Sequence, residues 1–318
     1  MRSKQGRRQL LRVVGTLASL GLLAYLVSRQ GWQTISDSIR QISPERLLLA
    51  FTLMFLSRLA VTARWTSLLW LSGLRLPAWE ILRVTFAGMF ASHFLPTSIG
   101  GDIVRLAWTV RVKGDRAKYA SSVAVDRLVG LAGMALLLPL GIAQVLGAGV
   151  LSSVARIVPL TVGTTASARL KGRLARGLGE VADLIRGWLN NPRALLAALT
   201  FTWIHMGLSF GSIWVLFQGL GEPLGYWQVA GLYSLVYVIS LFPFSIHSLG
   251  LAEVSAGLIY SSVGGAAVSS ALTVALLQRT TEILASLPGA LSLPPLLALR
   301  RVQSTPDVGP ILEHASDA

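Results

Sequence analysis

The residues best suited to chemistry in this sequence are charged side chains that stand within long apolar stretches. Asp102 and Arg105 follow the run Pro96-Thr-Ser-Ile-Gly-Gly, and Asp126 and Arg127 stand together in the next apolar stretch. A charge at the centre of a membrane helix costs about 2.5–3.5 kcal/mol on insertion scales. Each of these residues therefore needs a partner, a water-filled cavity or a function.

The first cluster has the features of an anion-binding site. Gly100 and Gly101 let the backbone approach a ligand closely, and Ser98 belongs to the same run. A helix that starts near Asp102 offers free backbone amides to an anion. Asp102 is also a favoured residue for capping a helix, and capping alone is the alternative interpretation.

The adjacent pair Asp126 and Arg127 cannot simply neutralise itself. Neighbouring residues on a helix point about 100° apart, so each side chain must reach a different partner. We expect Asp126 to reach Arg105, and Arg127 to reach Asp102. The alternative role is a salt bridge that holds the helices together, and both roles can coexist.

A second cluster is predicted near Glu253. This residue is the only Asp, Glu, Lys or Arg between Glu222 and Arg279. Arg279 is its expected partner, and Glu282 lies on the same helix face as Arg279 because the two are three residues apart. A buried structural pair is the alternative to a functional one.

Weaker candidates are the remaining polar residues of the apolar stretches. Arg58 and Arg64 do not share a helix face, so at least one is expected to extend to a membrane interface. His93, His205 and His247 are expected to be structural rather than proton relays.

Composition indicates the kind of molecule that positions these residues. The chain of 318 residues is 53% hydrophobic and 13% charged, whereas soluble domains carry about 25% charged residues. Uncharged blocks longer than about 18 residues are typical of membrane spans, and four occur here: Leu128–Val150, Ala194–Gly221, Pro223–Ala252 and Val254–Gln278. We predict an all-α polytopic membrane protein.

Other classes of function are disfavoured. The chain has no cysteine, which excludes disulfides and thiolate metal sites, and its four histidines lack ligand spacing. The net charge of +14 would suggest nucleic acid in a soluble protein. Here the basic residues cluster at segment ends, as the positive-inside rule requires. We therefore expect no metal, no cofactor and no nucleic-acid partner.

The expected topology has about six transmembrane helices and two re-entrant broken hairpins. A basic cytoplasmic N-terminus and a disordered cytoplasmic tail enclose a membrane domain, and a basic amphipathic segment lies on the cytoplasmic side within it. The expected parts are the terminus 1–9, the membrane domain 10–300, the basic segment 168–193 and the tail 301–318. The expected crossings are 10–28, 44–74, 119–148, 149–165, 194–220 and 266–299, with interrupted segments at 79–110 and 226–263.

The interruptions suggest an internal repeat. Pro96 breaks the first interrupted segment, and Pro243 with Gly250 breaks the second. The charge bias orients the halves 44–148 and 194–299 oppositely. Paired interrupted helices in inverted halves indicate a transport site near the membrane midplane.

Two stretches carry a resemblance to a known family. Phe94-Leu-Pro-Thr-Ser-Ile-Gly-Gly-Asp-Ile-Val-Arg105 and Ala124-Val-Asp-Arg-Leu-Val-Gly130 resemble the lysylphosphatidylglycerol synthase transmembrane-region family over about residues 10–300. This is the flippase-like membrane domain also found at the N-terminus of bacterial multiple peptide resistance factor. The family's second motif appears as Pro243-Phe-Ser-Ile-His-Ser-Leu-Gly-Leu-Ala-Glu253, in which histidine, serine and alanine replace two glycines and an arginine.

The resemblance implies lipid translocation or lipid handling without the aminoacyl-transferase domain of the full-length synthases. The leading hypothesis is a flippase for an anionic lipid, either a phospholipid or a polyprenyl-phosphate-linked one. Arg105 and Arg127 would attract the phosphate, and Asp102, Asp126 and Glu253 would hold the arginines and carry coupling protons.

Two alternatives remain open. One is a non-catalytic membrane subunit or regulator of envelope lipid metabolism, and the other is a membrane transferase that acts on a lipid-linked sugar. The sequence leaves a homo-oligomer open. The excess of Arg over Lys favours a GC-rich bacterial genome, so we expect a multi-pass protein of the bacterial inner membrane with both termini cytoplasmic.

Overall fold

A computed structural model describes residues 31–93, 100–109, 116–147, 191–241 and 250–292, with scattered positions between 21 and 28. The described residues form helices and contain no strand. The helices are α2 (Trp32–Gln41), α3 (Pro44–Leu71), α4 (Ala78–Ser92), α5 (Gly100–Thr109), α6 (Arg116–Gly147), α9 (Pro192–Gly219), α10 (Tyr226–Leu241), α11 (Leu251–Ser262), α12 (Val268–Ser286) and the 3-10 helix η2 (Leu287–Ser292). The prediction of an all-α chain is confirmed over this part.

Helices α3 and α9, which pack along each other as the central pair, begin and end in the same way. Ser43 precedes Pro44 at the start of α3, and Asn191 precedes Pro192 at the start of α9. Proline suits the first helical position because its missing N–H would have no partner there. Both helices are followed by a glycine with positive φ, Gly73 and Gly221, which is a favoured way to end a helix.

Three described helices are long and apolar enough to cross a membrane, namely α3, α6 and α9. Of the expected crossing 266–299, the structure describes α12, which ends at Ser286, and η2, which follows it to Ser292. Pro288 lies in that 3-10 turn and cannot donate the backbone hydrogen bond that would continue an α-helix. The expected crossings 10–28 and 149–165 lie largely or wholly outside the described residues, as do the terminus 1–9, most of the basic segment 168–193 and the tail 301–318.

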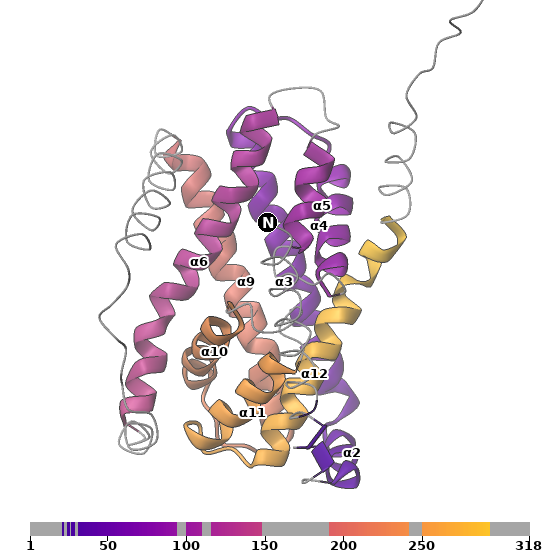
Figure 1. Ribbon diagram of the computed structural model, residues 1–318, viewed down its shortest axis with the longest axis vertical. Helices are drawn as coiled ribbons and strands as arrows, with labels where there is room; N and C mark the ends of the chain where they lie inside the picture. Colours follow the sequence, from indigo (N-terminus) through magenta and orange to yellow (C-terminus); the bar gives the residue numbers. More distant parts are fainter. Residues whose placement is uncertain are drawn as a thin grey trace, which may run out of the picture.

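Helices α4 and α5 pack together as a first hairpin, and α10 and α11 pack together as a second. Figure 1 shows α4 and α5 in the upper half of the molecule, and α10 and α11 in the lower half. Helix α3 packs along α9, α6 packs on α10, and α4 packs on α12 and η2. Helix α12 also contacts α3, and α6 contacts α9. The contacts of α6 with α9 and α10 thus correspond to the contacts of α12 with α3 and α4.

Glycines permit the closest of these approaches. A Cβ on Gly88 of α4 would stand 2.8 Å from the carbonyl oxygen of Gly101 in α5. A Cβ on Gly231 of α10 would stand 3.1 Å from the backbone nitrogen of Gly141 in α6. Small residues at such contacts let helices approach closely in a membrane, where packing rather than hydrophobicity drives association.

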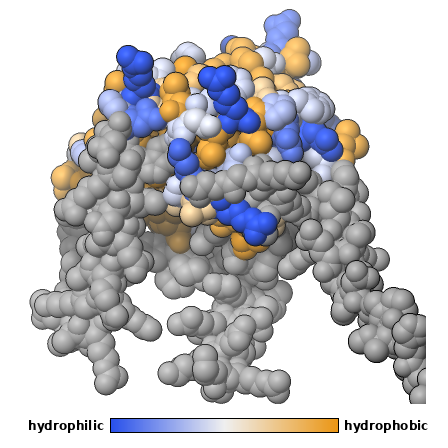
Figure 2. Space-filling model, turned by 90° about the horizontal axis from the view of Figure 1, so that it is seen from above, coloured by the Kyte–Doolittle hydropathy of each residue, from blue (hydrophilic) through white to orange (hydrophobic). Residues whose placement is uncertain are grey.

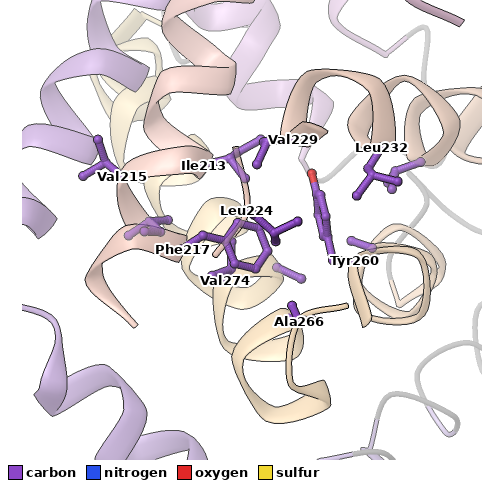
Figure 3. Close-up of a cluster of buried hydrophobic side chains, with 14 of the residues drawn as sticks. Ile213, Val215, Phe217, Leu224, Val229, Leu232, Tyr260, Ala266 and Val274 are labelled. Carbon is purple, nitrogen blue, oxygen red and sulfur yellow. The ribbon is translucent and has the colours of Figure 1, made fainter. Parts of the chain in front are cut away.

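The largest apolar core lies at the lower end, among α9, α10, α11 and α12 (Figure 3). The ring of Phe217 meets that of Tyr260 edge-on at 4.9 Å between centroids. Both side chains are fully buried. This core fixes the second hairpin against the C-terminal end of α9 and thereby positions the residues that follow Gly250.

Candidate functional site

Asp126 on α6 lies at the centre of a buried ion network in the upper half. One carboxylate oxygen accepts from Arg64 Nε at 2.7 Å, and the other accepts from Arg105 Nη1 at 2.8 Å. The Asp126 side chain is 2% exposed. A charge this deeply buried is stable only when it is paired and hydrogen-bonded, and both conditions are met here.

Aromatic side chains of α3 and α5 pack beside this network. The guanidinium carbon of Arg105 lies 4.0 Å from the ring centroid of Trp65 on α3, in a cation–π contact. The indole Nε1 of Trp65 donates to Ser122 Oγ on α6 at 3.1 Å. Trp65 also packs edge-on against Trp108 of α5. The side chain of Arg105 from α5 is thus held between α3 and α6.

Asp102 extends the network toward Arg127. Its carboxylate lies 3.5 Å from Arg105 Nη1 and 3.6 Å from Arg127 Nη1. The Arg127 side chain is 39% exposed, whereas that of Arg105 is 7% exposed. Arg127 is therefore the most accessible arginine of the upper network.

A second, looser network lies on α3, α11 and α12. Arg279 Nε lies 3.6 Å from Glu253 Oε1, and Arg58 Nη2 lies 3.6 Å from Glu282 Oε1. Gln278 Nε2 donates to Glu282 Oε1 at 3.2 Å. These ion pairs are longer than those at Asp126, so the charges are paired without tight hydrogen bonds.

A cavity of about 370 Å³ lies between the two networks. Its charged lining comes from both of them and consists of Arg58, Arg64, Arg127, Glu253, Arg279 and Glu282. Apolar and aromatic residues of α6, α9 and α10 complete the wall, among them Met134, Phe210 and Tyr237. The size falls within the range of small-molecule sites, which have volumes of about 300–1,000 Å³.

The cavity lies at the middle of the long helices. Arg58 stands 14 residues after Pro44 and 13 before Leu71, which places it about 20 Å from either end of α3 at 1.5 Å per residue. His205 stands equally near the middle of α9. Its Nδ1 forms a 2.6 Å hydrogen bond with Ser57 Oγ, which lies 2.8 Å from Ser209 Oγ. The expectation that His205 is structural agrees with this contact between the two central helices.

A comparison with known protein families identifies the family of this chain. The family described as the lysylphosphatidylglycerol synthase TM region matches residues 12–289, which is most of the chain. The chain belongs to this family. No curated protein matches the chain.

Membership of the lysylphosphatidylglycerol synthase TM region family confirms the resemblance carried by the two motifs. It places the chain among integral membrane proteins related to lipid handling. The motif residues Asp102, Arg105, Asp126 and Arg127 all belong to the upper network, which Arg64 completes. The family motif therefore corresponds to one connected set of charges.

The structure contains the pairings that the sequence predicted. Asp126 contacts Arg105, Arg127 contacts Asp102, and Arg279 is the partner of Glu253. Glu282 takes Arg58 as its partner across the bundle.

Three predicted headgroup ligands, Arg105, Gly100 and Gly101, do not line this cavity, and their role in binding stays a prediction. Arg105 does not line the cavity, because its side chain is directed to Asp126 and Trp65. Gly100 and Gly101 begin α5, and Gly101 packs against α4, where a Cβ would stand 2.6 Å from the carbonyl oxygen of Gly88. The structure thus gives Gly101 a packing reason that is independent of any ligand.

Other predicted residues cannot be placed. Ser98, Pro96, Pro243 and His247 lie outside the described residues. Gly250 is described, and it precedes α11 with a φ of 76°, a conformation that favours glycine.

Arg64 and Arg58, which the sequence analysis ranked as weaker candidates, belong to the two ion networks. The expectation that at least one of them reaches an interface is wrong, since Arg64 pairs with Asp126 and Arg58 with Glu282 inside the bundle. The signal that could have found them is their depth, because neither lies within a turn of the ends of the apolar stretch. A snorkelling arginine is expected near such an end.

Proposed function

We propose that this chain moves a lipid with an anionic headgroup across the membrane by way of the central cavity. The observation that carries the proposal is a cavity at the middle of the long helices whose lining includes four arginines, Arg58, Arg64, Arg127 and Arg279. Guanidinium groups bind phosphate through paired hydrogen bonds. A phosphate headgroup would otherwise face hydrocarbon at this depth, at a cost of several kcal/mol.

The carboxylates are proposed to hold the arginines in place. Arg64 Nε donates to Asp126 and Arg64 Nη1 donates to Thr202. We propose that Arg64 Nη2 binds the ligand. Asp102 orients Arg127 in the same way from α5. The arginines are thereby fixed before a headgroup arrives, and less conformational entropy is lost on binding.

The two hairpins are proposed to be re-entrant and to form inverted halves. Helices α4 and α5 extend from the upper end toward the middle, and α10 and α11 extend from the lower end (Figure 1). Interrupted helices that meet at the midplane from opposite sides are typical of transporters that open alternately to each side. Each hairpin contributes charged or polar lining to the cavity, such as Ser92 from α4 and Glu253 from α11.

The upper end is proposed to face the cytoplasm of a bacterial inner membrane. Exposed basic residues there include Arg75, Arg116, Lys118 and Arg193, and Figure 2 shows hydrophilic side chains among hydrophobic ones on this end. Described charges at the lower end are mixed: Asp37, Arg40, Glu45, Arg46 and Glu222. An excess of Arg and Lys marks the cytoplasmic side of membrane proteins.

Lipid exchange in proteoliposomes tests the proposal. The purified chain is placed in vesicles that contain phosphatidylglycerol with a fluorescent acyl chain, and the loss of inner-leaflet fluorescence to dithionite is followed. We expect the native chain to speed exchange. Arg127→Gln should slow it about tenfold or more, because a hydrogen bond to a charged group contributes about 1.5–3 kcal/mol.

Arg116→Gln is the matched control. It removes the same charge from the same helix, but Arg116 is exposed and lies outside the cavity. We expect this variant to exchange lipid at the native rate. Native protein that exchanges lipid no faster than empty vesicles would overturn the proposed function and favour a regulatory subunit.

A further inference from the structure

We infer that Glu253 takes up a proton when an anionic headgroup binds Arg279, so that the chain carries a proton together with the lipid. The inference rests on the proposed function and adds the ion that drives the movement. It follows from the geometry of the lower network, in which one edge of a guanidinium group must serve two anions in turn.

Glu253 differs from the other carboxylates around the cavity. Its side chain is 6% exposed and lines the cavity, and its Oε2 atom has no hydrogen-bond partner among the described residues. Asp126, by contrast, accepts short hydrogen bonds on both oxygens and does not line the cavity. Glu282 lines the cavity but accepts from Gln278 at 3.2 Å. Glu253 is therefore the least firmly held carboxylate of the described cavity wall.

Arg279 has one edge for which two anions would compete. The Nε and Nη2 atoms of a guanidinium lie on the same edge and together donate to two oxygens of a phosphate. In Arg279 neither atom has a hydrogen-bond partner among the described residues. Nε lies 3.6 Å from Glu253 Oε1, which is too far for a hydrogen bond. A phosphate that accepts from this edge would therefore replace the Glu253 carboxylate as the nearest anion.

The surroundings of Glu253 offer no substitute for Arg279. Helices α10 and α12 pack on α11. Arg279 and Glu282 of α12 are the charges that act on Glu253, and Tyr233 and Tyr237 of α10 line the same cavity. Of these described groups only Arg279 is a cation. Once it binds a phosphate, Glu253 has two anionic neighbours, and a proton on Oε2 removes the repulsion. One O–H bond forms, and no bond of the lipid breaks.

The headgroup and the proton are thus bound in the same state and released together. Each must strengthen the binding of the other by the same factor. Two like charges about 5 Å apart weaken binding on the order of a hundredfold at an effective dielectric constant near 20, and the proton removes this penalty. Where protons are more abundant outside the cell, the lipid would move from the outer leaflet to the inner one.

Proton uptake on headgroup binding tests the inference directly. Dihexanoyl phosphatidylglycerol is titrated into the full chain in detergent micelles, and the heat is measured near neutral pH in two buffers of different ionisation enthalpy. The difference gives the number of protons taken up per bound headgroup, because the phosphodiester of the probe stays ionised at this pH. We expect about one proton per headgroup, and an affinity that rises by up to about tenfold for each unit that the pH falls.

Matched variants assign the proton to its site. Glu253→Gln cannot take up a proton and should abolish the uptake. Glu282→Gln is the control, because Glu282 lines the same cavity from the neighbouring helix, and it should retain the uptake. Arg279→Gln removes the shared guanidinium, so Glu253 should be protonated before the headgroup arrives and the uptake should again be lost. This variant answers the question even if Glu253→Gln does not fold.

A pH gradient across vesicles tests the coupling of the two movements. Phosphatidylcholine vesicles with an acidic interior carry a trace of fluorescent phosphatidylglycerol, and the fraction of label accessible to external dithionite is measured. The native chain should raise this fraction above that at equal pH, whichever way it is inserted, and a protonophore should cancel the rise. Glu253→Gln should give the same fraction with and without the gradient.

The outcomes separate the two proposals. Headgroup binding without proton uptake, uptake that persists in Glu253→Gln, or exchange that ignores the gradient would overturn the proton inference and leave the proposed function standing. A native chain that neither binds the headgroup nor exchanges lipid would overturn the proposed function itself.

Discussion

Replacement of Asp126 by asparagine should be among the most destabilising conservative changes in this chain. The Asp126 carboxylate is 2% exposed and accepts at 2.7 Å from Arg64 and at 2.8 Å from Arg105. Asparagine keeps the shape but removes the charge, and its amide would present an N–H group to one of the two guanidiniums. Removal of one partner from a buried ion pair costs about 3–5 kcal/mol, because the other charge remains buried without compensation.

The remaining partners decide where in that range the loss should fall. Arg105 keeps Asp102 at 3.5 Å and the face of Trp65 at 4.0 Å. On the described helices, Arg64 keeps only a long hydrogen bond of 3.4 Å to Thr202. One arginine is therefore left largely uncompensated rather than two, and we expect a loss of about 3 kcal/mol.

Equilibrium unfolding in mixed micelles, followed by tryptophan fluorescence, measures this loss. The double variant Asp126→Asn with Arg64→Gln should lose clearly less than the sum of the two single variants, since it removes the unpaired charge with its partner. Asp37→Asn is the control, because its ion pair with Arg40 is exposed at the surface and should contribute less than about 1 kcal/mol. Additive single losses, or a loss below about 1 kcal/mol for Asp126→Asn, would refute the reasoning.

Three further changes have defined expectations. Gly88→Ala should lower the free energy of unfolding by about 1–3 kcal/mol, because the new Cβ would stand 2.8 Å from a backbone oxygen of α5. Gly147→Ala is the control, because the new Cβ would meet no neighbouring atom within 4 Å, and it should leave the free energy of unfolding in the same micelles almost unchanged. Arg58→Gln and Glu282→Gln should each destabilise the fold, and the double variant should recover part of the loss in a double-mutant cycle. Trp65→Leu should destabilise the chain by about 2 kcal/mol or more, because it removes the cation–π contact with Arg105 and the hydrogen bond to Ser122. Thermal unfolding of the purified protein measures this loss, and an unchanged midpoint would contradict the role given to Trp65.

The charged pairs could be predicted from the sequence because each is expensive without a partner. Asp126 and Arg127 point in different directions on one helix, and that geometry alone required two separate partners. The lone position of Glu253 similarly pointed to Arg279. Burial cost and helix geometry were therefore sufficient for these contacts.

The inward direction of Arg58 and Arg64 could not be predicted in this way. Helix α3 is apolar on most of its surface, since lipid and protein interior both favour apolar residues, so periodicity does not reveal which face is inside. The packing role of Gly101 was also hidden, because it depends on the approach of α4 to α5. Such contacts depend on which face each helix turns to its neighbours, and the pattern of apolar residues in one sequence does not reveal this rotation.

The ion pair between Arg58 and Glu282 has a consequence for the synthesis of the chain. These residues are 224 positions apart in the sequence, and a ribosome adds about 5–20 residues per second. Arg58 therefore waits about 10–45 s in the nascent chain for the partner that it has in the finished protein. During that time the apolar residues of α3 must offset the cost of the unpaired arginine, because this ion pair cannot form until α12 has been made.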